Sequence, residues 1–581
     1  MNNFEIWNET VYKLICLMNK RVIMKYLLSV LLVSLNIQTW AQLTVNARVL
    51  HQISRSDGYI IHADANGNIL VGGQLNIEFM TNQNVIDFDA SEAEELVTIT
   101  GSEDGFLCKL NPQGEILWAR TFGGEEDSPE WVWDITTDSE GNIYVAGNFS
   151  DYCDFDPSAA ENILYGALTD GYLLKLSPNG DLIWVREISS SSGDRAHGVA
   201  LKPNGEILVS GFMNADGFVG DLNDYLTIEA DGGILCSFNS DGTVNWAKVL
   251  ESSSLCNLNR IDVGNDGSIF GVGIFSGELD LDPSNNEYLV TAIGDEDGFY
   301  VKFDAVGNFV WGGSFGSLEE DWAYDLAVND QLELFITGHV KDTTFIGSPG
   351  NMEELSIGSI SDLLMAKISN AGEVAWAHTI PASGRSHCVS VDNSGNAVFG
   401  GYFNLTADFD PSENVAELER ISNNDLFLVR YNSTGEFENA YVINGDGSQI
   451  ARSIHISEEN TLYVTGTTSD TVDFDPGIGE FLLSSESSRS YFLKIQEGPS
   501  STVDLDLFQT SIYPNPVLNG QTLTLQDGIG WVRIFDLSGK LCFIQEIQEQ
   551  IETIPLNLAA GQYLVEIQGS EGRSLQKLQV E

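Results

Sequence analysis

Basic residues are scarce in this chain. It has 27 Lys and Arg residues against 85 Asp and Glu residues, so its formal net charge is −58 over 581 residues. Such an anionic surface repels phosphate backbones and anionic lipids, so nucleic acids and anionic membrane surfaces are not expected as partners. Because apolar residues make up 43% and aromatic residues 10%, the chain can bury sizeable cores. The composition predicts an acidic, folded protein and names no chemistry.

Cysteine is also scarce, and its spacing does not indicate a disulfide framework or a metal site. There are 7 Cys residues, with no CxxC pair and no Cys/His metal spacing. Cys108 and Cys236 occupy equivalent places in two copies of a repeat, where other copies have Leu174 or Val301. We therefore expect these thiols to act as small buried apolar side chains.

No apolar run is long enough to span a bilayer comfortably, which takes about 20 residues. The longest run of this kind, residues 26–37, follows Lys20, Arg21 and Lys25 and ends before a small residue, Ala41. This pattern predicts a secretory signal peptide over residues 1–41 and no transmembrane segment. Met24 opens a more ordinary signal sequence, so residues 1–23 are open to interpretation as a misassigned start.

The chain repeats one unit seven times. The phrase "GNIYVAGNFS" recurs with variations, and its central glycines lie 62 to 74 residues apart. These glycines are Gly73, Gly147, Gly211, Gly273, Gly338, Gly401 and Gly466. Within each unit, short apolar runs alternate with period two between turn signals such as "NPQG" and "DNSG", which predicts strands joined by hairpins.

Four strands fit in each unit, so the expected fold is all-β: a seven-bladed β-propeller over residues 42–497. Residues 44–50 match the fourth strand of a unit but stand before the first complete unit, and residues 490–495 are a third strand with no fourth after it. We therefore predict that the N-terminal strand completes the last blade and closes the ring, leaving no unpaired edge there. These repeats resemble bacterial β-propeller repeats of the SBBP type. That resemblance implies the fold and leaves the function open.

The C-terminal residues differ from the repeats. Residues 498–510 have the composition of a linker, and residues 511–581 contain short strands between Pro, Gly and Ser turns, which predicts a small β-sandwich. The motifs "YPNP" from Tyr513, "IFD" from Ile534 and "GQY" from Gly561 resemble the C-terminal sorting domain of the type IX secretion system of Bacteroidota. The resemblance implies recognition by that machinery and display at the outer surface of a Gram-negative bacterium.

One position, 14 residues before each central glycine, opens the first strand of each unit. If that strand lines the axis, these side chains form a ring at the mouth of a central channel. Flat rings with polar edges suit capture of a glycan or a protein, whereas the plainer interpretation is a packed, hydrogen-bonded collar. The ring residues are Tyr59, Trp133, His197, Asn259, Tyr324, His387 and Arg452.

Calcium is the one cofactor that the sequence leaves open. A motif of the form Asp-x-Asp-Pro recurs in the connection between the second and third strands, and paired carboxylates can bind Ca²⁺. No distal Glu follows, so an Asp-capped turn is the competing interpretation. The candidate ligands are Asp154, Asp156, Asp280, Asp282, Asp408, Asp410, Asp473 and Asp475.

Two further repeated positions are expected to be structural. A basic residue on the third strand of six units, with Ser237 the exception, predicts an ion pair with a nearby carboxylate. A Trp on the fourth strand of five units predicts packing between blades. The basic residues are Lys109, Lys175, Lys302, Lys367, Arg430 and Lys494, and the tryptophans are Trp118, Trp184, Trp246, Trp311 and Trp376.

The expected function is a monomeric, non-catalytic binding or adhesion module whose acidic face engages an unidentified glycan or protein. The alternative is a polysaccharide-active hydrolase or lyase on the same face. Carboxylates for cleavage would come from the loops that hold Glu125, Glu126, Glu319 and Glu320. No H-E-x-x-H, P-loop or Rossmann motif is present.

Overall fold

The computed structural model divides the chain into two compact parts, Met1–Glu497 and Gly498–Glu581, each described here by itself. It describes the strands between residues 511 and 580, and residues 43–497 apart from 51–54, 77–84, 89–94, 125–128, 159, 222, 356–357, 359–360, 458 and 476–480. The predicted signal peptide and linker lie outside the described residues. All regular elements that are described are strands, so the fold is all-β as predicted.

The first part contains one antiparallel four-strand order seven times along its described residues. The first three units are β2 (Arg55–Ala63), β3 (Ile69–Asn76), β6 (Glu103–Leu110) and β7 (Ile116–Phe122); β8 (Trp131–Thr137), β9 (Ile143–Asp154), β10 (Ile163–Leu176) and β11 (Leu182–Ser190); and β12 (Arg195–Leu201), β13 (Ile207–Met213), β16 (Gly232–Phe238) and β17 (Val244–Leu250). The next three units are β18 (Cys256–Val263), β19 (Ile269–Phe275), β22 (Asp297–Phe303) and β23 (Phe309–Gly316); β24 (Trp322–Val328), β25 (Leu334–Val340), β28 (Asp362–Ile368) and β29 (Val374–Ile380); and β30 (Arg385–Val391), β31 (Ala397–Phe403), β34 (Asp425–Tyr431) and β35 (Phe437–Gly445).

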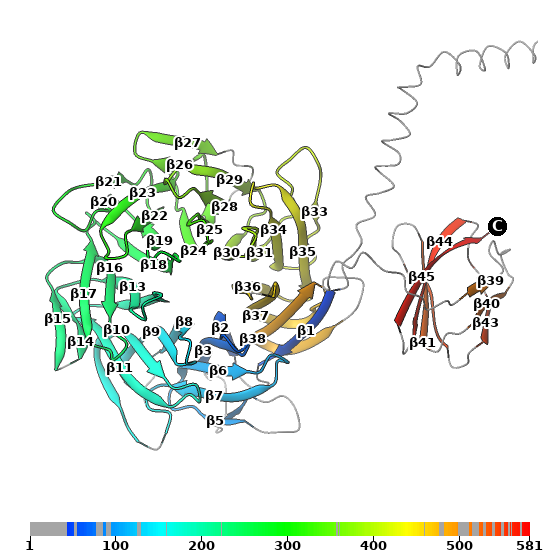
Figure 1. Ribbon diagram of the computed structural model, residues 1–581, viewed down its shortest axis with the longest axis horizontal. Helices are drawn as coiled ribbons and strands as arrows, with labels where there is room; N and C mark the ends of the chain where they lie inside the picture. Colours follow the sequence, from blue (N-terminus) through cyan, green and yellow to red (C-terminus); the bar gives the residue numbers. More distant parts are fainter. Residues whose placement is uncertain are drawn as a thin grey trace, which may run out of the picture. The chain divides into compact units, whose positions relative to one another are not determined.

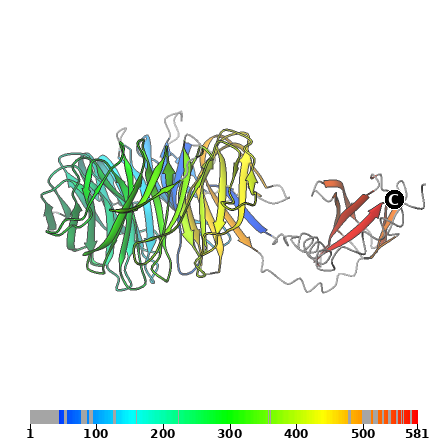
Figure 2. The same ribbon diagram turned by 90° about the horizontal axis from the view of Figure 1, so that it is seen from above.

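The seventh unit joins the two ends of this part. It consists of β36 (Gln449–Ile456), β37 (Thr461–Asp473), β38 (Leu482–Glu497) and the N-terminal strand β1 (Leu43–Val49). β1 pairs antiparallel with β38, from Leu43 opposite Glu497 to Val49 opposite Tyr491, which confirms the predicted pairing. The first strand of each unit contacts the first strand of the next, and β36 contacts β2. The units therefore follow one another around a circle with their first strands innermost (Figure 1), and the fold is propeller-like. Figure 2 shows these strands running between the two faces.

The central glycine of each unit is required by a β-bulge in the innermost strand. In the second unit, Val132 pairs with Gly147 and Asp134 with Ala146, which leaves Trp133 without a partner in the ladder. The bulge brings the Trp131 carbonyl oxygen to 2.1 Å from where a Cβ on Gly147 would lie. At all seven central glycines the corresponding distance is 1.9–2.1 Å, so any side chain would displace the backbone.

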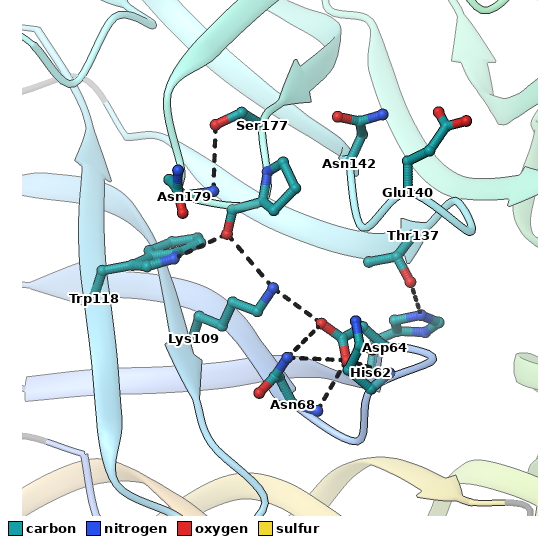
Figure 3. Close-up of polar contacts among 12 residues, drawn as sticks. His62, Asp64, Asn68, Lys109, Trp118, Thr137, Glu140, Asn142, Ser177 and Asn179 are labelled. Atoms are coloured by element: carbon teal, nitrogen blue, oxygen red, sulfur yellow. Dashed lines mark hydrogen bonds and ion pairs between the residues drawn. The ribbon is translucent and has the colours of Figure 1, made fainter.

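Neighbouring units are bound together through the turn between the third and fourth strands. Lys109 Nζ lies 2.9 Å from an Asp64 oxygen (Figure 3), and it also donates to the Pro178 carbonyl oxygen on the turn of the next unit. The Trp118 indole N–H donates to the same oxygen (3.3 Å). The equivalent lysine contacts are Lys175 to Ser240 O (3.1 Å), Lys302 to Asn370 Oδ1 (2.6 Å), Lys367 to Ser433 O (2.9 Å) and Lys494 to Pro112 O (2.8 Å).

The predicted ion pairs are confirmed at Lys109, Lys367 and Arg430. At the other positions the ammonium group donates to a neutral oxygen of the neighbouring turn. The third unit has Ser237 at this position, and there Lys202 and Lys248 donate to Ala305 O and Gly307 O of the next turn (2.8 and 2.7 Å).

The interface between the sixth and seventh units differs from the others. Since the fourth strand of the seventh unit is β1, no hairpin turn connects it to β38. The Arg430 side chain pairs within its own unit instead, with Asp392 and with Glu438, whose Oε2 lies 2.8 Å from its Nε. An apolar notch opens at this interface, lined by Val398, Leu428, Tyr441, Ile456, Leu462 and Ile495.

The connection between second and third strands contains an outer hairpin that the sequence did not indicate. In the second and seventh units the hairpin extends the two strands themselves. In the other units it is separate: β4 (Val85–Asp87) and β5 (Leu96–Thr98); β14 (Gly217–Asp221) and β15 (Asp224–Ile228); β20 (Glu278–Asp280) and β21 (Leu289–Thr291); β26 (Thr344–Ser348) and β27 (Asn351–Leu355); β32 (Ala407–Asp408) and β33 (Glu417–Leu418). β14 pairs with β11, and β26 pairs with β23. The hairpin thereby covers the outer strand of the preceding unit, which would otherwise be an exposed edge.

The cysteines that the structure describes are buried and unpaired, which confirms their role as small apolar core residues. They are Cys108, Cys153, Cys236, Cys256 and Cys388.

The second part contains two sheets. One has the order β39 (Ser511–Tyr513), β40 (Thr522–Gln526) and β43 (Ile551–Pro555). The other has the order β42 (Leu541–Ile547), β41 (Gly530–Asp536), β44 (Gly561–Gly569) and β45 (Gly572–Val580). Val532, Ile534 and Val565 are buried.

Removing β1 should destabilise the first part strongly. Deleting residues 43–49 breaks seven ladder pairs and removes Ala47, which is 5% exposed. It also frees the adjacent Leu50, which is 0% exposed, from its anchoring strand. Backbone hydrogen bonds and apolar burial of this size predict a loss of at least about 3 kcal/mol in the free energy of unfolding, measurable by urea denaturation. Deleting residues 1–41 is the control and should change nothing. Equal unfolding curves for the two deletions would contradict the closing role of β1.

A second substitution tests the link between bulge and glycine. Gly211→Ala would place a Cβ 1.9 Å from the Arg195 carbonyl oxygen, so we expect a loss of about 3 kcal/mol or more. Gly193→Ala is the matched control because no atom lies within 4 Å of its Cβ position, and its effect should stay within about 0.5 kcal/mol. Similar denaturation midpoints for the two variants would refute this explanation of the repeat signature.

Candidate functional site

The seven ring residues predicted from the sequence are the seven bulge residues of the innermost strands. Each is left out of the ladder at the register shift in its unit. We call Tyr59, Trp133, His197, Asn259, Tyr324, His387 and Arg452 the axial ring.

Contacts between neighbouring units bring members of the axial ring together. The ring centroids of Tyr59 and Trp133 are 4.7 Å apart, those of Trp133 and His197 5.6 Å, and those of Tyr324 and His387 4.9 Å. Asn259 Nδ2 donates to the Ala323 carbonyl oxygen on the next innermost strand (3.2 Å).

A second tier surrounds the axial ring and was missed by the sequence analysis. Trp131 stacks on Trp133 with centroids 6.3 Å apart and planes 9° apart. Trp322 packs beside Tyr324 at 6.0 Å. These residues stand two places before the axial ring, at the same strand phase, so the period-two rule could have found them. In the fifth unit the residue after the central glycine adds to this tier, since His339 Nδ1 and the Tyr324 hydroxyl share a hydrogen bond (3.0 Å).

The histidines of this region are neutral. Burial lowers the pKa of His197 and of His339 to about 3, and nearby arginines add to the effect. The pKa of His387 is lowered well below its usual value by burial, then by Arg452 and Arg385. Burial also raises the pKa of Tyr59 and of Tyr324. The positive charge at the mouth therefore comes from arginine.

Beneath the axial ring, buried polar groups bond the innermost strands to one another. Arg260 follows Asn259 and donates to the carbonyl oxygens of His197 and Trp133 on two other units. Three buried or half-buried aspartates accept backbone N–H groups of neighbouring units: Asp134 from Val199 (2.8 Å), Asp262 from Val328 (3.0 Å) and Asp325 from Val389 (3.0 Å). These bonds satisfy N–H groups on strand edges that have no ladder partner, so the layer below the ring is a hydrogen-bonded collar.

The Asp-x-Asp-Pro motifs lie in the outer hairpins, away from the axial ring. Asp154 Oδ1 accepts the backbone N–H groups of Asp156 (3.0 Å) and Asn162 (2.9 Å). Asp280, Asp408 and Asp473 accept the equivalent pairs of N–H groups, and the first of the two donors is Asp282, Asp410 or Asp475. The residue between the two aspartates is fully buried, as Phe155 shows. Each motif thus caps a turn, and no group of three His, Cys, Asp or Glu residues in the described chain could hold a metal ion.

The loop carboxylates considered for cleavage do not form a pair in the described residues. Glu125 and Glu126 lie outside them. Glu319 and Glu320 are exposed, and Glu320 pairs with Lys341 at 3.1 Å.

Buried carboxyl groups do face each other between units, close to the start of the innermost strands. Burial raises the pKa of Glu130 to about 10, with Asp104 adding to the shift. It also raises the pKa of Asp297 to about 7, with a contribution from Asp321. Since Glu130 is 0% and Asp297 1% exposed, these groups are inaccessible to a substrate and act on stability instead.

The comparisons with known proteins concern mainly the C-terminal part. Residues 511–581 match the family model of the secretion system C-terminal sorting domain. An uncharacterised WD repeat-containing protein of Acanthamoeba polyphaga mimivirus is 23% identical over 240 residues, which are 35% of this chain and 17% of that protein. The chain thus spans less than a fifth of that relative.

Solved structures with similarity to the chain include a propeller, a secretion-system surface component and a polysaccharide lyase. The Dos1 propeller is 11% identical with a TM-score of 0.35, covering 77% of this chain and 95% of that one. The surface component PorZ of the type IX secretion system of Porphyromonas gingivalis is 11% identical with a TM-score of 0.18, covering 92% and 100%. The polysaccharide lyase Uly1 is 10% identical with a TM-score of 0.36, covering 76% and 90%. At these TM-scores the likenesses say nothing about function.

The described residues contain no helix long and apolar enough to cross a membrane. The C-terminal match shows that the chain carries a sorting domain, which indicates interaction with the secretion machinery, export and attachment at the outer surface of a Gram-negative bacterium.

The buried carboxyl groups should make the protein less stable as the pH rises. Because the folded state raises the pKa of Asp297 from 3.8 to about 7, it binds more protons than the unfolded state between these values, and stability falls with pH across that window. We expect the free energy of unfolding to drop by a few kcal/mol, roughly, from pH 4 to pH 8. Asp297→Asn should make this slope shallower in urea titrations, whereas the exposed neighbour substitution Asp295→Asn should keep it. A slope unaffected by Asp297→Asn would exclude this group.

Proposed function

We propose that the seven repeat units are the blades of a closed seven-bladed β-propeller of the SBBP type over residues 42–497. A signal peptide (1–41) precedes it, and a linker (498–510) joins it to the sorting domain (511–581). Two features support this organisation. β1 pairs with β38, and the innermost strands contact one another in a continuous cycle.

We further propose that this propeller is a monomeric, non-catalytic binding or adhesion module that engages a glycan or protein at the axial ring. The observation that carries the proposal is that all seven bulges present aromatic, His, Asn or Arg side chains at one place. A bulge aims its extra residue out of the ladder, so these side chains are not needed to pair strands. Half-buried aromatic faces such as Trp133 and Tyr59 suit sugar rings and apolar peptide side chains.

A lyase is the second candidate, favoured by one observation. The Tyr324 hydroxyl bonds to His339 Nδ1 at 3.0 Å, and the Arg385 guanidinium lies 5.9 Å from the Tyr324 ring centroid. A Tyr–His pair beside an arginine could abstract a proton next to a carboxylate. Binding is preferred because His339 is 2% exposed and its pKa is lowered to about 3, so it has little access to substrate and is a weak base.

Glycan-array and protein-capture screening of the full chain tests the binding function. Trp133→Ala should reduce binding of any captured ligand by at least about tenfold, since loss of one stacked aromatic face costs of the order of 1–2 kcal/mol. Trp246→Ala is the control, because Trp246 belongs to a fourth strand and contacts Lys202 and Lys248. Equal binding by the two variants would exclude the axial ring as the site. Ultraviolet-absorbing unsaturated products from a bound polysaccharide would favour the lyase instead.

A further inference from the structure

The axial mouth concentrates arginines that have no carboxylate partner, in a chain with a net charge of −58. Arg195, Arg385 and Arg452 form no ion pair with any described residue, whereas Arg120, Arg186, Arg260 and Arg430 each do. The sequence predicted an acidic face for ligand binding, and these three arginines lie on the innermost strands at the axial mouth.

The acidic groups near the mouth are already bonded within the protein. Asp57 accepts the Thr467 hydroxyl at 2.8 Å, Glu103 accepts the amides of Gln74 and Asn76, and Glu320 pairs with Lys341. Asp57 and Glu103 contribute to the raised pKa of Tyr59, and Glu320 contributes to the raised pKa of Tyr324. These carboxylates therefore already have hydrogen-bond or ion-pair partners, whereas Arg195, Arg385 and Arg452 have no carboxylate partner among the described residues.

The charges of Arg385 and Arg452 affect the same two side chains, His387 and Tyr324. Both lower the pKa of His387 and both influence Tyr324, so their charges converge between the fifth, sixth and seventh units. The Arg385 guanidinium lies 5.8 Å from the Trp322 centroid and 5.9 Å from the Tyr324 centroid. Cation–π packing holds a guanidinium by its face and leaves its N–H groups in the plane free to donate. Arg452 Nε is buried and has no hydrogen-bond partner.

We propose that this part of the mouth, formed by Tyr324, Arg385, His387 and Arg452, binds the carboxylate of an acidic sugar, so that the ligand is a uronate-containing polysaccharide. The inference rests on the proposed function and specifies its ligand class. Paired guanidinium groups match a carboxylate in geometry and charge. The aromatic faces of Tyr59, Trp131 and Trp133, on the neighbouring first and second units, provide stacking surfaces for further sugar rings.

A sugar is favoured over an acidic peptide because of the other polar groups at the mouth. The neutral histidines leave arginine as the only cation at the ring, and the amide of Asn259 and the rings of Trp133 and Tyr324 add flat or polar edges rather than further charge. Such a mixture suits a ligand with many hydroxyls and widely spaced carboxylates. The chain is also exported to the cell surface, where polysaccharides are accessible.

The long-range charge of the protein does not prevent this binding. At physiological ionic strength, exposed charges more than about 8 Å apart are largely screened, whereas carboxylate–guanidinium contacts are formed at hydrogen-bond distance. Measurements should therefore be made at that ionic strength.

The experiment compares two matched probes on the full chain by isothermal titration calorimetry: an oligogalacturonate and the same oligosaccharide after reduction of its carboxyl groups. We expect the acidic probe to bind at least about tenfold more tightly, because a hydrogen-bonded charge pair contributes about 1.5–3 kcal/mol. Arg385→Gln and Arg452→Gln should each weaken binding of the acidic probe by a similar factor. Arg420→Gln, which removes the same charge from an exposed outer loop, should not. Thermal unfolding of each variant controls for folding.

Three results would overturn the inference. Equal binding of both probes would exclude carboxylate recognition while leaving glycan binding in place. Binding of polyglutamate, with the same arginine dependence and without binding of the oligogalacturonate, would identify an acidic protein as the ligand. Absence of binding to the acidic probe, with a neutral glycan captured by the same chain in a Trp133-dependent manner, would refute the ligand class and retain the proposed function.

Discussion

One constraint recurs through the first part of the chain: the close approach of a bulged innermost strand to the glycine on the strand beside it. The bulge displaces a carbonyl oxygen into the space that a Cβ would occupy, as at Arg195 and Gly211. The same bulge therefore explains both the glycine that identifies each repeat and the residue that faces the axis. Wherever this glycine and bulge occur together, one side chain of the innermost strand is left out of the ladder and can serve another purpose.

The repeat pattern allowed the strand order, the pairing of β1 with β38 and the position of the axial ring to be predicted, because each depends on spacing that seven copies repeat. The outer hairpins could not be predicted, since their pairing with the preceding unit depends on contacts between units. For the same reason, the partners of Lys175 and Lys494 are turn oxygens rather than carboxylates. Composition could not indicate the arginines at the mouth, because a net charge does not show where individual charges lie.

Burial determines which of the many acidic residues have a raised pKa. Most carboxylates of the Asp-x-Asp-Pro motifs accept backbone N–H groups in turns, and others pair with lysines at the unit interfaces. A few, such as Glu130 and Asp297, are enclosed and hold protons that an exposed carboxyl would lose. The Asp-x-Asp-Pro motif, which suggested a metal site, therefore has a structural explanation. The buried carboxyl groups of Glu130 and Asp297, whose pKa values are raised, lie in the interior.

Glu497 is the residue through which a pull from the C-terminal side of the chain reaches the first part. A force transmitted along the chain enters the first part at the end of β38, which is flanked by β37 on one side and β1 on the other. A strand with two neighbours cannot be peeled off one bond at a time from a free side, because both of its ladders must shear together. The arrangement that completes the last sheet thus places a strand held on both sides where tension is applied.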